Sequence, residues 1–240
     1  MHEERACRKE QNGKTIKQLI SRIRQGSIQF MMRFARVGVI VALFFAASLL
    51  LVAGYFYIRS SAMRDYVVQE WIFSERFARY DSLIAQAGSR HGVNPSLVKA
   101  VIWRETRFQS QVEGSHGERG LMQITEVAAA DWVNAEKVET FVPTDLFDPK
   151  TNIEVGTWYL GRAIKHWGHK DDPIPFALSE YNAGRTRVRR WEKSSGDIAD
   201  FSAEDLRDVM DFPLTKQYVA SIIERYNHYL MRGEFSKKPI

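Results

Sequence analysis

The sequence predicts a mainly α-helical protein, with one membrane-spanning helix near the N-terminus followed by one helical domain. Residues 37–58 contain no charged side chain. From 79 to about 233, apolar residues recur at helical spacing between glycine, proline and asparagine, without the alternating Val/Ile/Thr-rich runs typical of strands. The single cysteine, Cys7, excludes an intramolecular disulfide and disfavours a structural zinc site. The domain must therefore be stabilised by its own core.

The positive charge of the chain is confined to its N-terminus. The 240 residues carry a formal net charge of +5. Residues 1–36 contain nine Lys and Arg against three Glu, a net charge of +6, and the remainder has a net charge of −1. A basic leader on a nearly neutral body is not typical of a nucleic-acid-binding domain, so no nucleic-acid partner is expected.

The uncharged segment 37–58 is long enough to cross a membrane. Its 22 residues, at about 1.5 Å per residue, span a hydrocarbon core of about 30 Å. A buried helix of a soluble domain and a cleaved signal peptide are the alternatives, but signal peptides have shorter apolar regions, of about 7–15 residues. We therefore predict an uncleaved signal anchor. The basic excess before it predicts a cytoplasmic N-terminus, with all residues from 59 onward outside.

This reading divides the chain into five parts and predicts six helices in the domain. The parts are a basic cytoplasmic segment, an anchor, a juxtamembrane linker, a folded domain and a tail: 1–36, 37–58, 59–78, 79–233 and 234–240. Capping residues and apolar spacing predict helices over 79–90, 95–107, 126–135, 149–168, 173–183 and 214–231.

Glu105 is the first candidate for chemistry. It follows Val101 by four positions, so it lies on the apolar stripe of its predicted helix. Partial burial disfavours the ionised form of a carboxyl group and raises its pKa, as a general acid near neutral pH requires. The alternative is a glutamate at a helix end that pairs with Arg104, Arg107 or an arginine elsewhere in the chain.

Two glycine-containing segments are weak signals when each is taken alone. The segment 114–124 contains three glycines before a capped helix, which suits either a loop that a polymer approaches closely or a simple connector. The sequence Tyr-Asn-Ala-Gly at 181–184 suits an ordinary helix end.

Four motifs in a fixed order give the chain a specific resemblance. They are W-R-E-T-R-F around Glu105, G-E-R-G-L-M-Q-I at 117–124, L-F-D-P-K-T-N-I-E-V-G-T-W-Y-L at 146–160 and E-Y-N-A-G at 180–184. Together they resemble the lytic transglycosylases of the soluble-transglycosylase (SLT, goose-lysozyme-like) family over residues 79–233. The resemblance implies a lysozyme-like helical domain that binds peptidoglycan glycan strands, cuts the MurNAc–GlcNAc bond and leaves a 1,6-anhydro-MurNAc end.

The resemblance also implies the roles of individual residues. Glu105 matches the single catalytic acid/base. The matching substrate-binding positions are Thr106, Met122, Gln123, Tyr181 and Asn182. No metal or cofactor is implied, protein partners are left open, and the anchor implies a bacterial inner membrane with the domain in the periplasm.

Two departures from the family pattern leave alternatives open. Glu180, where alanine is common, is a possible second carboxylate, although solvent exposure near Arg185 would also explain it. Leu214 stands where relatives often have an acid. The alternative functions are a lysozyme-like muramidase that hydrolyses the same bond and a non-catalytic glycan-binding scaffold.

Overall fold

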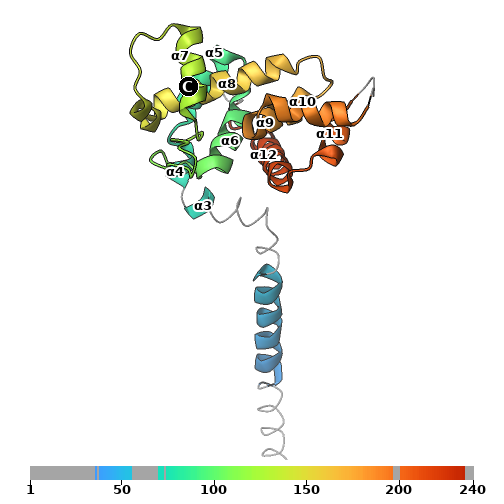
Figure 1. Ribbon diagram of the computed structural model, residues 1–240. Helices are drawn as coiled ribbons and strands as arrows, with labels where there is room; N and C mark the ends of the chain where they lie inside the picture. The colour runs from blue at the N-terminus through green and yellow to red at the C-terminus, as the bar shows by residue number, and fades with distance from the viewer. Residues whose placement is uncertain (1–35, 37, 56–69, 73, 197–200, 236–240) are drawn as a thin grey trace, which may run out of the picture. The chain divides into compact units, whose positions relative to one another are not determined.

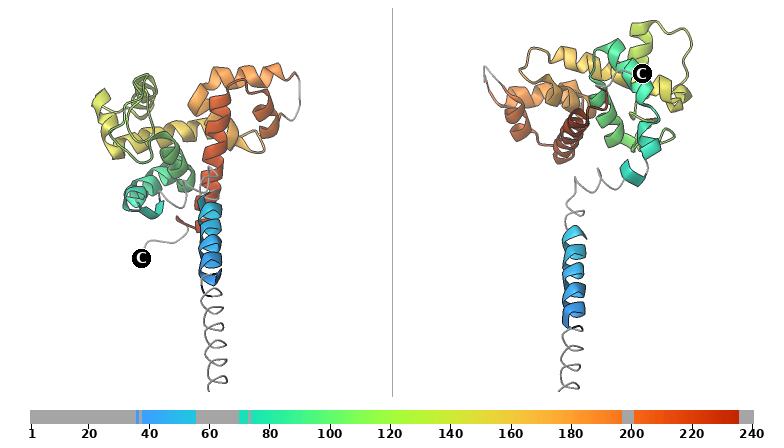
Figure 2. Two further views of the ribbon diagram at one scale, coloured as in Figure 1. Left: turned by 90° about the horizontal axis from the view of Figure 1, so that it is seen from below. Right: turned by 180° about the vertical axis from the view of Figure 1, so that it is seen from behind.

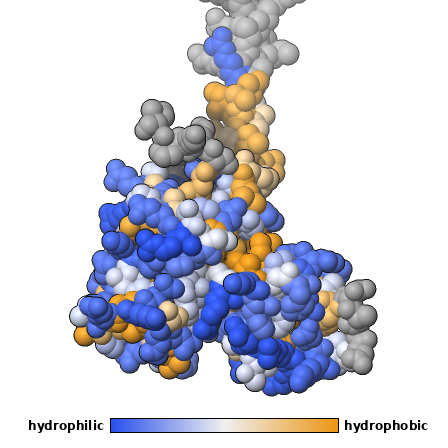
Figure 3. All heavy atoms as spheres, turned by 90° about the horizontal axis from the view of Figure 1, so that it is seen from above, coloured by the Kyte–Doolittle hydropathy of each residue, from blue (hydrophilic) through white to orange (hydrophobic). Residues whose placement is uncertain are grey.

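The computed structural model describes residues 36, 38–55, 70–72, 74–196 and 201–235. The chain forms two compact units, Met1–Ile72 and Phe73–Ile240. Among the described residues, Gly38–Tyr55 is the one helix long and apolar enough to cross a membrane, by length and composition alone. None of this helix is buried, and its surface is apolar while most of the visible surface of the second unit is hydrophilic (Figure 3). The predicted basic segment, the ends of the anchor and most of the linker lie outside the described residues.

The second unit consists of helices, as the sequence predicts (Figure 1). Short α3 (Glu70–Ile72) ends the first unit. The second unit contains α4 (Ser74–Ala78), α5 (Asp81–His91), α6 (Pro95–Thr106), α7 (Glu126–Glu136), the 3₁₀ helix η2 (Pro143–Phe147), α8 (Pro149–His166), α9 (Pro173–Ala183), α10 (Arg185–Ser194), α11 (Ala203–Val209) and α12 (Pro213–Arg232). Strand-like pairing in the described residues is limited to isolated bridges between residues 113 and 119 and between residues 119 and 124.

Local capping explains where the predicted helices begin. The side chain of Asn94 accepts the N–H of Ser96 at the start of α6, and Thr125 and Asp148 cap α7 and α8 in the same way. Each of these side chains satisfies a backbone donor that the helix leaves free. Gly92 follows α5 in the left-handed conformation, a common way for a helix to end.

Helix α6 is packed between other helices and brings its last turn to α12. It packs against α5 and α12, while α12 also packs against α9, and α9 packs against α8 (Figures 1 and 2). The residues of α6 that face the core are fully or almost fully buried: Leu97, Val98, Ala100, Val101 and Ile102. Side chains at the end of α6 therefore meet side chains from α12.

The folded unit extends beyond both ends of the predicted range 79–233. At the N-terminal end, Phe77 is buried and its ring centroid lies 5.1 Å from that of Phe108. At the C-terminal end, Glu234 lies 2.8 Å from the buried ammonium group of Lys99. The prediction placed Phe77 in the linker and Glu234 in the tail, but both contribute to the domain.

Candidate active site

Glu105 lies in the last turn of α6 and is only partly exposed. The helix ends because Arg107 and Phe108 adopt positive φ angles of 52° and 63°. This turn sends the Phe108 ring into the core, where it is 2% exposed. The carboxyl group of Glu105 is thus fixed at the end of a rigid helix, which is a suitable support for a catalytic group.

The environment of Glu105 favours its protonated form. Burial of the carboxyl raises the pKa of Glu105 from 4.5 to about 7. The hydroxyl of Tyr218, on α12, donates a hydrogen bond of 2.6 Å to Glu105 Oε1. That bond and the charge of Arg104 lower the pKa, while the negative charge of Glu118 raises it. At neutral pH, Glu105 can therefore both give and take a proton.

The alternative ion pairs of Glu105 are not formed among the described residues. The guanidinium of Arg104 lies over the Tyr218 ring, 5.5 Å from its centroid. The guanidinium of Arg107 lies 3.5 Å from the centroid of the Trp103 ring. Both arginines are therefore placed on aromatic rings, and Tyr218 is the hydrogen-bond partner of the glutamate.

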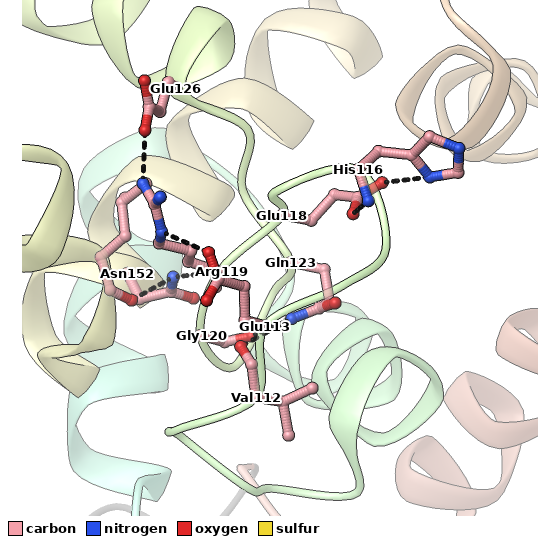
Figure 4. Close-up of polar contacts among 10 residues, drawn as sticks. Val112, Glu113, His116, Glu118, Arg119, Gly120, Gln123, Glu126 and Asn152 are labelled. Carbon is pink, nitrogen blue, oxygen red and sulfur yellow. Dashed lines mark hydrogen bonds and ion pairs between the residues drawn. The ribbon is translucent and has the colours of Figure 1, made fainter.

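The loop of residues 112–124, which follows α6 in the sequence, contains the glycine-rich motif and is cross-linked by hydrogen bonds and ion pairs (Figure 4). The N–H of Gly114 bonds the carbonyl of Glu118 at 2.7 Å, and Arg119 and Ile124 exchange backbone bonds of 2.9 and 3.0 Å. The guanidinium of Arg119 joins Glu113 to Glu126 with contacts of 3.2 and 2.6 Å. Such cross-links hold the loop in one conformation.

Gln123 is held by the loop in an unusual backbone conformation. Its φ angle is 49°, in the left-handed region that L-residues other than Asn and Asp rarely adopt. Its amide nitrogen donates to the carbonyls of Val112 and Gly120 at 3.2 and 3.0 Å. These bonds fix the side chain, so that the amide oxygen remains as an acceptor.

Tyr181 and Asn182, at the end of α9, reach the loop and α12. The Tyr181 hydroxyl donates to the carbonyl of Met122 at 2.9 Å. Burial, and then the charge of Glu105, raise the pKa of Tyr181 well above its usual value, which places the two side chains near each other. The exposed Asn182 accepts a bond of 2.7 Å from the hydroxyl of Thr215 through its amide oxygen.

The side chains of Thr106 and Met122, two of the predicted substrate-binding residues, lie in the core. The Thr106 hydroxyl donates to the carbonyl of Leu121 at 2.9 Å, and the residue is 5% exposed. Met122 is fully buried, and a methyl group built on Gly156 would touch its sulfur. Both residues support the wall of the site from behind.

Glu180 is buried, so the expectation of a solvent-exposed carboxylate is wrong. It is 2% exposed, and Arg185 contacts both of its oxygens, with the shortest distance at 2.7 Å. The indole N–H of Trp167 donates to Glu180 Oε2 at 2.8 Å. Because all these bonds hold Glu180 inside the fold, it is a poor candidate for a second catalytic carboxylate.

The sequence reasoning missed Tyr218, Thr215 and Glu118. Glu118 stands in the glycine-rich motif at 117–124, but nothing in the sequence singles out Tyr218 or Thr215. Their contacts with the site depend on packing between distant segments, which a single sequence does not reveal. The described residues contain no group of three or more His, Cys, Asp and Glu side chains that could hold a metal ion.

A separate cavity lies on another side of α12. It has a volume of about 590 Å³ and is lined by residues of α9, α11 and α12, among them Leu206, Met210, Lys216 and Ile223. Glu105 and Tyr218 are not among its lining residues. The cavity is therefore distinct from the site around Glu105.

Comparison with known proteins agrees with the fold and the motifs. Residues 82–202 match the family model described as the transglycosylase SLT domain. The chain is 30% identical over 156 residues to the membrane-bound lytic murein transglycosylase F of Desulfosudis oleivorans, covering 63% of this chain and 32% of that protein. It is 30% identical over 161 residues to the soluble lytic murein transglycosylase of Escherichia coli K12, covering 65% of this chain and 24% of that protein.

A solved structure supports the fold. The lytic transglycosylase Slt of Pseudomonas aeruginosa, determined as an inactive mutant, matches with a TM-score of 0.62 at 22% identity. The match covers 78% of this chain and 29% of that one. The chain thus spans about a quarter to a third of the length of these relatives. Because the family model covers just over half of its residues, the chain belongs to the transglycosylase SLT domain family.

Proposed function

We propose that the domain is a peptidoglycan lytic transglycosylase that cuts the β-1,4 bond between MurNAc and GlcNAc. The observation that carries this proposal is the half-buried Glu105, held by Tyr218 and with a pKa of about 7. The family membership and the names of its relatives, which are murein transglycosylases, support the substrate class. Gln123, Tyr181 and Asn182 are the proposed substrate-binding side chains.

The proposed reaction uses Glu105 twice. Protonated Glu105 gives its proton to the leaving GlcNAc oxygen while the bond from that oxygen to the anomeric carbon of MurNAc breaks. The acetamido oxygen of MurNAc bonds to the anomeric carbon at the same time, a substrate-assisted route that needs no second nucleophile from the protein. The ionised Glu105 then takes the proton of the C6 hydroxyl, whose oxygen attacks the anomeric carbon and displaces the acetamido oxygen.

The product of this route is a 1,6-anhydro-MurNAc end, with Glu105 again protonated. The C6 hydroxyl belongs to the same sugar, and a well-oriented internal nucleophile has an effective concentration of about 10⁵ M or more. Bulk water is far less concentrated than that. Ring closure is therefore expected to win over hydrolysis.

We further propose that residues 37–58 anchor the protein in a bacterial inner membrane. The exposed apolar helix Gly38–Tyr55 supports this proposal, because side chains of that composition are stable in a hydrocarbon core. The basic residues before it favour a cytoplasmic N-terminus, which puts the catalytic domain in the periplasm beside its substrate.

Mass spectrometry of the products released from purified sacculi tests the proposal. The full chain in detergent should release fragments one water lighter than those made by a lysozyme, with ends that borohydride does not reduce. Glu105→Gln should lower turnover by about 10²–10⁴-fold or more while binding to sacculi is retained. Reducible MurNAc ends would indicate a muramidase, and binding without any release would indicate a scaffold.

A further inference from the structure

The carboxylate of Glu118 lies beside the amide oxygen of Gln123, over the backbone of Gly114. A methyl group built on Gly114 would lie 2.3 Å from Glu118 Oε2 and 2.8 Å from Gln123 Oε1. The two oxygens therefore converge on one small region of the loop, and Figure 4 shows both side chains on it. Glycine at position 114 leaves the room that both oxygens occupy.

Both oxygens are acceptors held in place by the loop. The N–H of His116 donates to Glu118 Oε2 at 3.0 Å, and the side chain of Glu118 is 27% exposed. Gln123 uses its amide nitrogen on two backbone carbonyls, so its oxygen cannot exchange places with the nitrogen without losing those bonds. This pair of fixed acceptors suits a single donor group of a ligand.

Glu118 is ionised, and its charge reaches Glu105. Hydrogen bonds from backbone N–H groups, first its own and then that of His116, lower the pKa of Glu118. The negative charge of Glu118 raises the pKa of Glu105, as the smallest of the four effects on that carboxyl. Two carboxyl groups whose pKa values are driven apart in this way commonly have different roles in one reaction.

We propose that Glu118 and Gln123 together accept the acetamido N–H of the MurNAc unit that is cut. This inference rests on the proposed function. When the acetamido oxygen bonds to the anomeric carbon, positive charge develops on the amide, and a hydrogen bond from its N–H to a carboxylate becomes stronger. The proton stays on the nitrogen, and Glu118 forms no covalent bond.

The role of Glu118 differs from that of a base in a hydrolase. Glu118 orients the acetamido group and stabilises the positive charge that develops on it, and it does not activate water. Its presence is therefore compatible with a 1,6-anhydro product. The sequence alone suggested Glu180 as a possible second carboxylate of the site, but its oxygens are bonded to Arg185 and Trp167. Glu118 is the carboxylate that we propose instead.

The first test compares Glu118→Gln with Glu113→Gln, using the full chain in detergent and purified sacculi. Glu113 is a matched control, because it is on the same loop, is about half exposed and pairs only with Arg119 among the described residues. Glu118→Gln should lower kcat by about tenfold or more, with a smaller change in KM, because the interaction strengthens in the transition state. Glu113→Gln should change kcat less than about twofold.

A second readout is the pKa of Glu105, followed by NMR of its labelled carboxyl carbon and by the alkaline limb of the pH–activity profile. Tyr218 on α12 contacts this carboxyl, and the charges of Arg104 on α6 and Glu118 on the loop also act on its pKa. The charge of Glu105 in turn raises the pKa of Tyr181 on α9. Glu118→Gln removes the negative charge, so the pKa of Glu105 and the alkaline limb should both move to lower pH. Glu113→Gln should leave both unchanged.

Gly114→Ala displaces the two acceptors without removing a charge. The three atoms nearest to the added methyl group are side-chain atoms of Glu118 and Gln123 rather than backbone atoms, so the domain should fold normally by circular dichroism. Its kcat should fall as in Glu118→Gln. If the wild type is active and Glu118→Gln changes neither kcat nor the pKa of Glu105, this inference is overturned and the proposed function still holds. A wild type that releases no product from sacculi overturns the proposed function instead.

Discussion

Burial of the Glu105 carboxyl lowers the free energy of unfolding of the domain at neutral and alkaline pH. In the unfolded chain its pKa is near 4.5, and in the folded protein burial raises it to about 7. The folded state therefore binds a proton more tightly than the unfolded state, and the free energy of unfolding falls as pH rises from about 4.5 to 7. A shift of this size corresponds to about 3 kcal/mol. A residue kept in such an environment is better explained by function than by stability.

Glu105→Gln should therefore stabilise the domain at alkaline pH. The amide cannot ionise, so the variant lacks the loss of stability between about pH 4.5 and 7. At pH 8 its Tm should exceed that of the wild type by several degrees, because about 1 kcal/mol shifts Tm by about 2–4 °C in a domain of this size. At pH 4 the two melting temperatures should be nearly equal. Equal Tm values at pH 8 would contradict the raised pKa.

Tyr218→Phe should shift the pH dependence of activity in the direction opposite to Glu118→Gln. The Tyr218 hydroxyl stabilises the ionised form of Glu105, so its loss raises the pKa of that carboxyl. The alkaline limb of kcat/KM should move to higher pH. Tyr226→Phe, two turns along the same helix, is the control and should leave the limb in place. A limb that stays in place in Tyr218→Phe would show that this bond does not set the protonation of Glu105.

At the scale of elements, the glycine-rich loop is held by two left-handed glycines whose surroundings differ. Gly117 and Gly120 have φ angles of 82° and 72°. A methyl group on Gly117 would meet nothing within 4 Å, whereas one on Gly120 would lie 2.1 Å from the carbonyl oxygen of Leu146 and 2.3 Å from Asn152 Nδ2. Asn152 is fully buried and accepts the N–H of Met122 at 2.7 Å. The close approach at Gly120 joins the loop to α8.

Gly117→Ala and Gly120→Ala form a matched pair of variants. In Gly117→Ala the alanine must adopt the left-handed conformation, which lowers the free energy of unfolding by about 1–2 kcal/mol, and no collision is added. Gly120→Ala adds a collision with a backbone oxygen of Leu146 and with the buried side chain of Asn152, so it should cost at least about 1–3 kcal/mol more. Urea denaturation measures both costs. Equal midpoints for the two variants would contradict the tight packing of Gly120.

The helices were predictable where the sequence carries both a cap and an apolar stripe. The six predicted helices correspond to α5, α6, α7, α8, α9 and α12. Helix α10 was missed because Arg and Lys dominate it and only Val188 and Trp191 are buried. Helix α11 has a capping box between Ser202 and Asp205 that sequence inspection could have found.

The candidate site was predictable only in part, because its residues come from separate elements. Glu105 could be predicted from its place on an apolar stripe, and Gln123, Tyr181 and Asn182 from the family motifs. Tyr218 is 113 residues from Glu105 in the sequence, so the bond between them follows from the packing of α12 on α6. The burial of Glu180 likewise depends on Trp167 and Arg185.

At the scale of the whole molecule, charge and hydropathy divide the chain into parts suited to different surroundings. The leader of residues 1–36 is basic, the helix Gly38–Tyr55 is apolar and exposed, and the remainder is nearly neutral. A soluble protein does not normally expose so many consecutive apolar side chains. A bilayer would cover them, and the basic leader would keep the N-terminus on the cytoplasmic side.

A reporter fused after Ile240 tests this topology in cells. With the N-terminus in the cytoplasm, a reporter that is active only after export should be active, and one that is active only in the cytoplasm should not. Replacing most of the nine basic residues of segment 1–36 by glutamine should reduce export, because orientation follows the difference in Lys and Arg across the span. Replacing the same number of basic residues within α10 and α12 is the control and should leave export unchanged, since those residues lie far from the span in sequence.

Activity of the cytoplasmic reporter in the unmodified protein would contradict the topology. A mature protein that begins near Tyr55 would instead show that the apolar segment is a cleaved signal peptide, and the catalytic domain would then be released from the membrane.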